Sequence, residues 1–192
     1  MQEAGDHNLE LGITVAGRYV VESLLGVGGL AEVYKVRHVD LGSLHALKLL
    51  TFRRRGYDER LKREGQIQAN LRHPNVVTVT DIVTIDGQLA LVMEYIDGTS
   101  LDALLAQQRK LPYVDAMALF APVIAAVAWA HDAGAVHRDL KPGNVLLART
   151  PVGWVPKVAD FGIGKLVDAA AQDGAGKTRA GVAMGTPGYM AP

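Results

Sequence analysis

The sequence predicts an α+β fold in two parts, a small antiparallel sheet that carries one helix and a following helical part. Five apolar stretches bounded by turn residues fall before Tyr95, and one charged segment with helical character, Tyr57 to Leu71, interrupts them. After Asp97-Gly98 the residue pattern changes to that of helices. Asp97-Gly98 therefore marks the boundary between the two parts.

The apolar stretches predict five strands, Tyr19–Leu25, Glu32–Val39, Leu44–Leu50, Val76–Ile85 and Gln88–Tyr95. The last two flank Asp86-Gly87, a dipeptide typical of tight hairpin turns. We assign residues 1–17 to an N-terminal tail, residues 18–95 to the sheet-rich part and residues 96–192 to the helical part.

Two helices are expected after the boundary. Thr99 or Ser100 can cap a short helix that runs through Gln107, and Pro112 opens a long helix. Gly134 is placed to end the long helix in a left-handed conformation. The apolar run of the long helix is too short and too rich in alanine for a membrane span, so we expect a buried helix.

A glycine-rich segment, Leu25 to Ala31, separates the first two predicted strands. Glycine lets backbone N–H groups approach phosphate oxygens, because no Cβ stands in the way. Such a turn alone is a weak signal, since tight hairpins and dinucleotide-binding turns use similar spacing. A helix should follow a dinucleotide-binding turn, whereas Glu32 to Val36 has strand character.

A short loop and the segment after it carry groups suited to phosphate chemistry. The loop reads His137-Arg138-Asp139-Leu140-Lys141-Pro142-Gly143-Asn144, and Asp160-Phe161-Gly162 follows. Phosphoryl transfer needs a carboxylate to orient a hydroxyl, oxygen ligands for Mg²⁺ and a cation beside the moving group. Asp139 could fill the first role, Asn144 and Asp160 the second, and Lys141 the third.

These motifs, in this order along the chain, resemble those of eukaryotic-type (Hanks-type) serine/threonine protein kinases, and the match looks closest to bacterial members. The resemblance covers Arg18 to Pro192. It implies a bilobal protein-kinase-like fold, with a complete N-lobe of five strands and one helix and a partial helical C-lobe. The family's Ala-Pro-Glu motif stops here at Ala191-Pro192, so we expect a fragment of a longer product or a truncated gene.

The resemblance also implies roles for residues of the N-lobe. Lys48 would hold the α- and β-phosphates of ATP and pair with Glu64 of the single helix; Glu59 is the rival partner and suits a solvated helix face. A lysine in an apolar stretch could equally lay its stem along the surface and reach water. Ala31 replaces the third glycine of the family pattern. This difference should affect the mobility of the glycine-rich loop and its affinity for nucleotide.

A nucleotide pocket in the cleft between the lobes is implied by the same resemblance. Met93 would be its gatekeeper, and the carbonyl of Glu94 and the N–H of Ile96 would meet the adenine edge. The other expected nucleotide-binding residues are Leu25, Val33 and Ala46 above the ring, Leu146 below it, and Gly26, Val27, Gly28 and Gly29 of the glycine-rich loop. Simple core packing is the alternative for the apolar residues.

The implied reaction is transfer of the γ-phosphoryl group of ATP to serine or threonine hydroxyls of proteins, with Mg²⁺ or alternatively Mn²⁺. His137 is expected to be a packed scaffold residue, because Asp139 already supplies the base. For regulation, Arg138 can pair with a phosphate on the activation segment, Thr178 is the candidate for autophosphorylation, and Thr186 would hydrogen-bond Asp139 and Lys141.

The amino-acid composition limits the classes of binding partner that we expect. Twenty basic and twenty acidic residues cancel, so we expect neither nucleic acid nor an anionic membrane as a partner. The chain has no cysteine and its first residues show no secretory signal, which favours a cytoplasmic protein. Without further C-lobe residues, the long helix would expose apolar surface and favour self-association. The alternative function is a nucleotide-binding or regulatory module without turnover.

Overall fold

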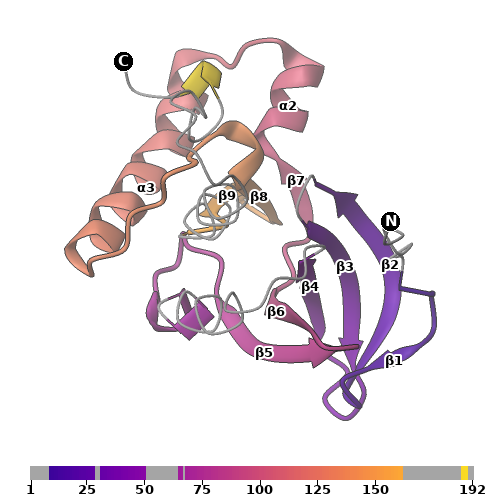
Figure 1. Ribbon diagram of the computed structural model, residues 1–192. Coiled ribbons are helices and arrows are strands. Elements are labelled where there is room, and N and C mark those ends of the chain that lie inside the picture. Colours follow the sequence, from indigo (N-terminus) through magenta and orange to yellow (C-terminus); the bar gives the residue numbers. More distant parts are fainter. Residues whose placement is uncertain (1–8, 29–30, 51–64, 67, 162–186, 190–192) are drawn as a thin grey trace. The chain divides into compact units, whose positions relative to one another are not determined.

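The computed structural model describes residues 9–28, 31–50, 65–66, 68–161 and 187–189 (Figure 1). Its contacts divide the chain into two compact units. The first unit comprises Met1–Lys62 and Val79–Tyr95, and the second comprises Arg63–Thr78 and Ile96–Pro192.

The first unit is a six-stranded sheet with the strand order β1-β2-β3-β4-β6-β5, in which every neighbouring pair is antiparallel. Its strands are β1 Thr14–Val15, β2 Tyr19–Val27, β3 Ala31–His38, β4 Leu44–Leu50, β5 Val79–Ile85 and β6 Gln88–Glu94. At the predicted hairpin, Asp86 and Gly87 take φ values of 48° and 78°, as a primed turn requires.

Two details of this sheet differ from the sequence prediction. The sheet has a sixth strand, β1, in residues that the sequence analysis placed in a tail; the backbone of β1 pairs with β2, with Val15 opposite Tyr19. Strand β5 begins at Val79 rather than at Val76. The reason is that Val76 bridges Val158 and the N–H of Val77 donates to the Val158 carbonyl at 2.8 Å, so this stretch groups with the second unit.

Alternation along the strands separates two faces of the sheet. One face forms the core of the unit and contains Tyr34, Val36, Leu47, Leu49, Ala90 and Val92, none of which is more than 2% exposed. The residues adjacent to them in sequence, such as Val33, Ala46 and Lys48, point to the opposite face. Burial of the core face stabilises the sheet. The opposite face carries predicted nucleotide-binding residues, among them Val33, Ala46 and Lys48.

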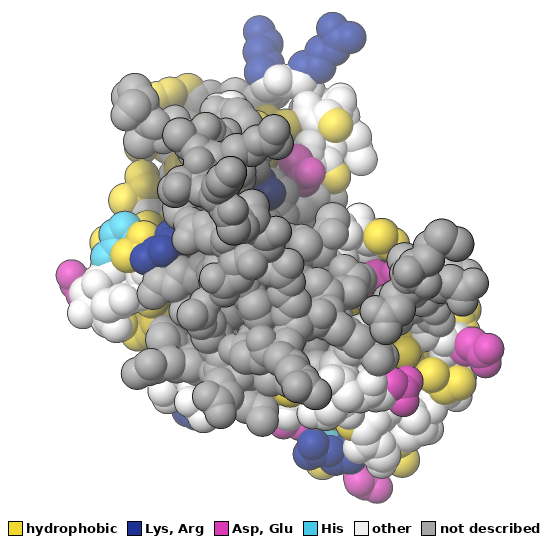
Figure 2. Space-filling view, in the orientation of Figure 1, with side chains coloured by type: hydrophobic (Ala, Val, Ile, Leu, Met, Phe, Trp, Pro, Cys, Tyr) yellow, Lys and Arg dark blue, Asp and Glu magenta, His cyan; other side chains and the backbone are white. Residues whose placement is uncertain are grey.

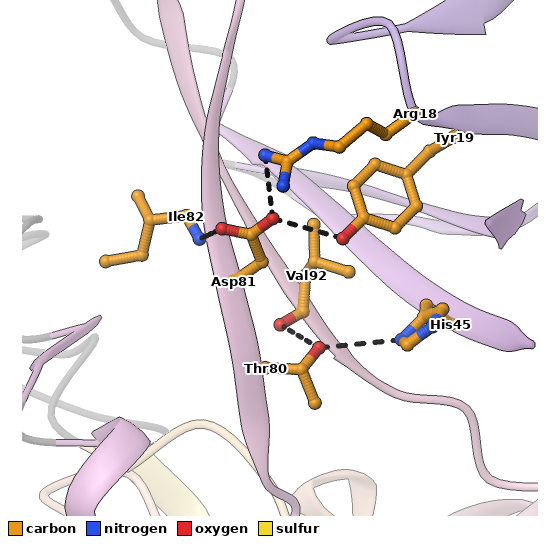
Figure 3. A network of polar contacts seen from close by, with 7 residues as sticks. All are labelled: Arg18, Tyr19, His45, Thr80, Asp81, Ile82 and Val92. Atoms are coloured by element: carbon orange, nitrogen blue, oxygen red, sulfur yellow. Dashed lines mark hydrogen bonds and ion pairs between the residues drawn. The ribbon is translucent and has the colours of Figure 1, made fainter. Parts of the chain in front are cut away.

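Polar side chains join the two ends of this sheet (Figure 3). Asp81 on β5 accepts a hydrogen bond from the Tyr19 hydroxyl at 3.1 Å and forms an ion pair with Arg18 at 2.9 Å. Beside them, the Thr80 hydroxyl donates to the Val92 carbonyl at 3.2 Å and lies 3.5 Å from His45 Nδ1. Because Tyr19 and Asp81 sit on strands near opposite ends of the strand order, these bonds show that the sheet is curled.

The second unit contains a three-stranded antiparallel sheet, β7-β8-β9, in addition to helices. Its elements are β7 Gly98–Ser100, α2 Leu101–Gln108, α3 Tyr113–Asp132, β8 Val145–Thr150, β9 Gly153–Val158 and the 3₁₀ turns Pro142–Asn144 and Pro187–Tyr189. The two helices lie where the sequence predicted them, and Gly134 takes φ 79° after α3. The strands β7, β8 and β9 are additional to these helices, and the sequence analysis did not predict them.

Helix α3 packs against β9 and divides into a buried and an exposed face (Figure 1). Leu119, Val123, Ala126 and Ala130 are buried in a cluster that includes Leu147 and Val158. Tyr113, Val114, Met117 and Ile124 are exposed large apolar residues. Among the described residues, α3 alone is long and apolar enough to cross a membrane by length and composition, a test that a soluble core helix also passes.

Charged side chains show no large patch of one sign on the face of the described residues drawn in Figure 2; acidic and basic groups lie there in small separate clusters. This agrees with the balanced charge of the sequence, twenty basic against twenty acidic residues.

Candidate active site

The loop that follows α3 brings together three of the predicted functional side chains. Lys141 Nζ lies 2.8 Å from Asp139 Oδ2, and Asn144 Nδ2 donates to the backbone carbonyl of Asp139 at 2.7 Å. The same amide lies 3.4 Å from Asp139 Oδ2. The side chains of Asp139 and Lys141 remain 28% and 33% exposed, so the carboxylate is held in place but can still meet a substrate.

A 3₁₀ turn, Pro142–Asn144, positions the amide. The N–H of Asn144 donates to the Lys141 carbonyl at 2.9 Å, and the Asn144 carbonyl accepts from the N–H of Ala159 at 2.9 Å. Asp160 follows Ala159 directly, at the end of β9. The backbone bond therefore couples the two predicted metal-binding residues, Asn144 and Asp160, within one unit.

His137 is a buried bridge beneath this loop, 2% exposed. Its Nδ1 accepts from the N–H of Asp139 at 3.3 Å, and its Nε2 lies 2.8 Å from the Ala159 carbonyl. A carbonyl can only accept, so Nε2 carries the proton and the ring is neutral. Burial lowers the pKa of His137, which favours the same neutral form. With Phe161 at 4.8 Å between ring centroids, His137 acts as a packed scaffold residue.

Two residues of this region take backbone conformations that are unusual for residues other than glycine. Arg138 has φ 69° and Asp160 has φ 66°. Each such residue costs on the order of 1–3 kcal/mol and persists only where its surroundings impose it. The strained backbone at Arg138 and Asp160 flanks the His137 bridge, which is consistent with a functional constraint on the loop. Arg138 itself is exposed.

The first unit places several predicted nucleotide-binding residues on one face of its sheet. Val33 lies opposite Gly26 on β2 and opposite Lys48 on β4, and Ala46 lies opposite Met93 on β6. Residues opposite each other in a ladder share a face, and so do residues two apart in one strand. Lys48 is 9% exposed, and Met93 is 7% exposed.

The glycine-rich turn joins β2 to β3. The N–H of Gly28 donates to the Ala31 carbonyl at 2.8 Å, and a Cβ on Gly28 would lie 3.4 Å from that carbonyl oxygen. A Cβ on Gly26 would meet nothing within 4 Å, and Leu25 and Val27 are exposed. The backbone on this side of the turn is therefore open to approach by a ligand.

Some of the remaining predicted site residues lie in one or the other unit, and the rest lie outside the described part of the chain. Glu94 ends β6 opposite His45, while Ile96 and Leu146 belong to the second unit and are half-buried. The residues that lie outside the described part of the chain are Gly29, Glu64, Thr178 and Thr186. The pairing of Lys48 with Glu64 and the regulatory roles of the two threonines stay predictions.

A divalent cation fits the donor atoms that the second unit offers. Within the described residues, no group of three or more histidine or acidic side chains could hold a metal by itself. Asn144 and Asp160 supply an amide and a carboxylate oxygen, which are the hard donors that Mg²⁺ prefers. Mg²⁺ usually takes one or two protein ligands and completes its shell with water and phosphate oxygens. The donor set thus suits a metal that arrives with a nucleotide.

Two backbone contacts that the sequence did not predict also shape this region. The carbonyl of Ala159 holds His137, and Gly98 lets β7 pair with β8, since a Cβ there would lie 1.8 Å from the Leu147 carbonyl oxygen. Two short apolar stretches, residues 145–148 and 154–158, on either side of Gly153 were the signal that could have revealed this hairpin.

Comparisons with known proteins agree on one family. A family model described as the protein kinase domain matches residues 19–192. The serine/threonine-protein kinase pkn3 of Myxococcus xanthus is 37% identical over 188 residues, which cover 95% of this chain and 34% of that protein. PknA of Mycobacterium tuberculosis is 37% identical over 190 residues, covering 95% of this chain and 42% of that protein.

A solved structure gives the same result. The crystal structure of the Mycobacterium tuberculosis PknI kinase domain matches with a TM-score of 0.70 and 33% sequence identity, covering 84% of this chain and 69% of that one. The chain thus spans less than half the length of the two curated relatives. The family model, the curated relatives and the shared fold show that this chain belongs to the protein kinase family, with bacterial serine/threonine kinases among its relatives.

Proposed function

We propose that the protein phosphorylates serine and threonine hydroxyls of proteins with ATP. The arrangement of Asp139, Lys141 and Asn144 supports this most directly, because a carboxylate is held by one cation and one amide and remains open to solvent. The names of the relatives, serine/threonine-protein kinases, favour hydroxyl groups of serine and threonine over that of tyrosine.

In the proposed reaction the substrate hydroxyl oxygen attacks the γ-phosphorus, and the bond from that phosphorus to the leaving oxygen of ADP breaks. Asp139 orients the hydroxyl and accepts its proton. Lys141, 2.8 Å from Asp139, offsets negative charge on the phosphoryl group as it moves. Asn144 and Asp160 would hold Mg²⁺, which supplies further charge neutralisation on the phosphates when bound.

Residues of the first unit bind the nucleotide in this proposal. The sheet face with Val33, Ala46 and Met93 is apolar and suits an adenine ring, and Lys48 on the same face suits the α- and β-phosphates. Backbone N–H groups of the glycine-rich turn would contact phosphate oxygens.

Regulation and location are further proposals. We propose autophosphorylation at Thr178 and pairing of that phosphate with Arg138, whose side chain is exposed. We also propose a cytoplasmic location and no nucleic-acid partner, on composition alone. Self-association through the exposed face of α3, which includes Met117 and Ile124, is proposed because large exposed apolar patches favour contact between proteins.

The test of the proposed function combines binding and transfer on the same preparation. MgATP should raise the melting temperature of the protein, and label from γ-labelled ATP should appear on serine and threonine of a generic protein substrate. Chelation of divalent metal should abolish the transfer. Binding without transfer would support the alternative function, a nucleotide-binding module without turnover. Absence of both binding and transfer would exclude both functions.

A further inference from the structure

Two linked hydrogen bonds, one partly buried and one buried, run through the first unit next to the glycine-rich turn. The N–H of Leu9 donates to the Tyr34 hydroxyl oxygen at 2.9 Å, and the Tyr34 hydroxyl donates to the carboxylate of Glu32. Tyr34 is 1% exposed and Glu32 is 8% exposed. The direction of both bonds is fixed, because an amide can only donate and an ionised carboxylate can only accept.

This chain of bonds ends at the turn itself. Glu32 lies opposite Val27, and theirs is the last strand pair before the turn between β2 and β3. Ala31, which precedes Glu32, accepts the hydrogen bond that closes the turn from Gly28. Among the described residues of β2 and β3, Glu32 alone is both charged and buried.

Strand β2 gives the turn little support from its own side. The pairing of β2 with β3 shifts register between Val21 and Ser23 and again between Leu24 and Gly26. Leu25 and Val27 are exposed, so their side chains do not fix the strand in the core. Strand β3, in contrast, pairs with β4 without a register shift, so β3 is the regular side of this turn.

The residues at the other end of the chain of bonds belong to an N-terminal arm, which we define as residues 9–15. Gly12 donates to the Val21 carbonyl at 2.8 Å and Val21 donates to the Ile13 carbonyl at 2.9 Å, so the backbone holds the arm against β2. Leu9 packs against the core of the sheet. The N–H of Leu9 therefore donates to Tyr34 from an arm that is held against the sheet.

The hydrogen bond between Tyr34 and Glu32 matters energetically because the Glu32 carboxylate is buried. A buried carboxylate is costly unless it is hydrogen-bonded, so removal of the Tyr34 hydroxyl takes a hydrogen-bond donor away from the buried Glu32 carboxylate. Burial, followed by the hydrogen bond to Glu32, raises the pKa of Tyr34 to about 12, so the hydroxyl keeps its proton near neutral pH.

We propose that Tyr34 is a positioning residue for nucleotide binding, and that it holds Glu32, and through Glu32 the glycine-rich turn, when the N-terminal arm is docked. This inference rests on the proposed binding of ATP phosphates by the turn. Residues 9–15 are then a working part of the nucleotide-binding unit, and displacement of the arm weakens nucleotide affinity.

The chain offers a matched control for the test. Tyr19 is also a buried tyrosine, 3% exposed, and its hydroxyl also donates to a carboxylate, that of Asp81 (Figure 3). Its strand neighbours are Val15 and His38, at the end of β2 away from the turn. Tyr34→Phe and Tyr19→Phe each remove one such hydroxyl, and both should lower the melting temperature by a few degrees.

Nucleotide affinity separates the two variants. With a fluorescent ATP analogue and Mg²⁺, Tyr34→Phe should raise the Kd about tenfold, the effect of one lost hydrogen bond to a charged group. Tyr19→Phe should change the Kd by less than about twofold. In steady-state assays Tyr34→Phe should raise KM for ATP with little change in kcat. Equal Kd values for the two variants would overturn the inference.

The role of the arm is tested by deletion of residues 1–13, which removes the Leu9 N–H. The deletion should raise the Kd about as much as Tyr34→Phe, and the two changes combined should raise it no further, because they interrupt one chain of bonds. Multiplying effects would exclude the arm from this role. If Tyr34→Phe does not fold, Glu32→Gln, which keeps an acceptor but loses the charge, takes its place against Tyr19→Phe. Failure of the unmodified protein to bind the analogue would instead refute the proposed function.

Discussion

Asp139→Asn should lower the rate of phosphoryl transfer by about 10²–10⁴-fold and leave MgATP affinity nearly unchanged. The amide has the size of the carboxylate and still offers an oxygen to Lys141, which lies 2.8 Å from the native side chain. It cannot accept the proton of the substrate hydroxyl. Initial rates with γ-labelled ATP and the Kd of a fluorescent analogue measure the two effects separately.

Asp132→Asn is the control for the loss of a carboxylate, because Asp132 is exposed at the end of α3. This variant should transfer phosphate at the normal rate. Parallel losses of binding and transfer in Asp139→Asn would show that the carboxylate serves the structure of the loop and not the reaction.

Lys48→Met should reduce transfer at subsaturating ATP by about 10²–10³-fold, the usual effect of removing one group that stabilises charge at a reacting centre. Methionine keeps the apolar stem of this buried residue and removes only the ammonium. The loss should appear in kcat/KM measured with γ-labelled ATP, while the melting temperature without nucleotide changes little.

Lys35→Met is matched to this change. Lys35 lies on the same sheet face, opposite Ala46, but its ammonium sits 3.3 Å from Glu22 and 5.1 Å from the centre of the Tyr95 ring. Its removal should change kcat/KM by no more than a few-fold. Similar losses in the two variants would show that the Lys48 ammonium has no special role in the reaction.

The sheet of the first unit could be predicted from the sequence because its strands are marked by strong local signals. Apolar stretches bounded by turn residues predicted β2 to β6, and Asp86-Gly87 predicted the hairpin turn. Strand β1 was missed because two residues carry too little alternation to be recognised. Its place depends on a nonlocal contact, the pairing of Val15 with Tyr19.

In the second unit, too, the sequence predicted the elements with local signals and missed those that depend on nonlocal contacts. Helix α3 was predictable from its length, from Pro112 before it and from Gly134 after it. Strand β7 has three residues and exists because Gly98 can approach the Leu147 carbonyl, which no local pattern reveals. Strand β5 began later than predicted because Val76 and Val77 bond to Val158, far along the chain.

The candidate site was predictable as a set of residue types but not as a network. The sequence pointed to Asp139, Lys141 and Asn144, and the structure brings these three together. It could not show that His137 reaches the carbonyl of Ala159, because such bonds depend on how β9 returns beside the loop. The bond from Leu9 to Tyr34 could not be predicted for a similar reason, since it joins residues 25 positions apart.

Phosphoryl transfer as proposed requires that Lys48 and Asp160, which belong to different units, act on the same MgATP. A double-mutant cycle on MgATP affinity with Lys48→Met and Asp160→Asn tests this requirement directly. We expect the double variant to lose less binding free energy than the sum of the single losses, with a coupling of about 0.5–3 kcal/mol. Loss of MgATP affinity in neither or in only one of the single variants would contradict a shared nucleotide and with it the proposed kinase reaction.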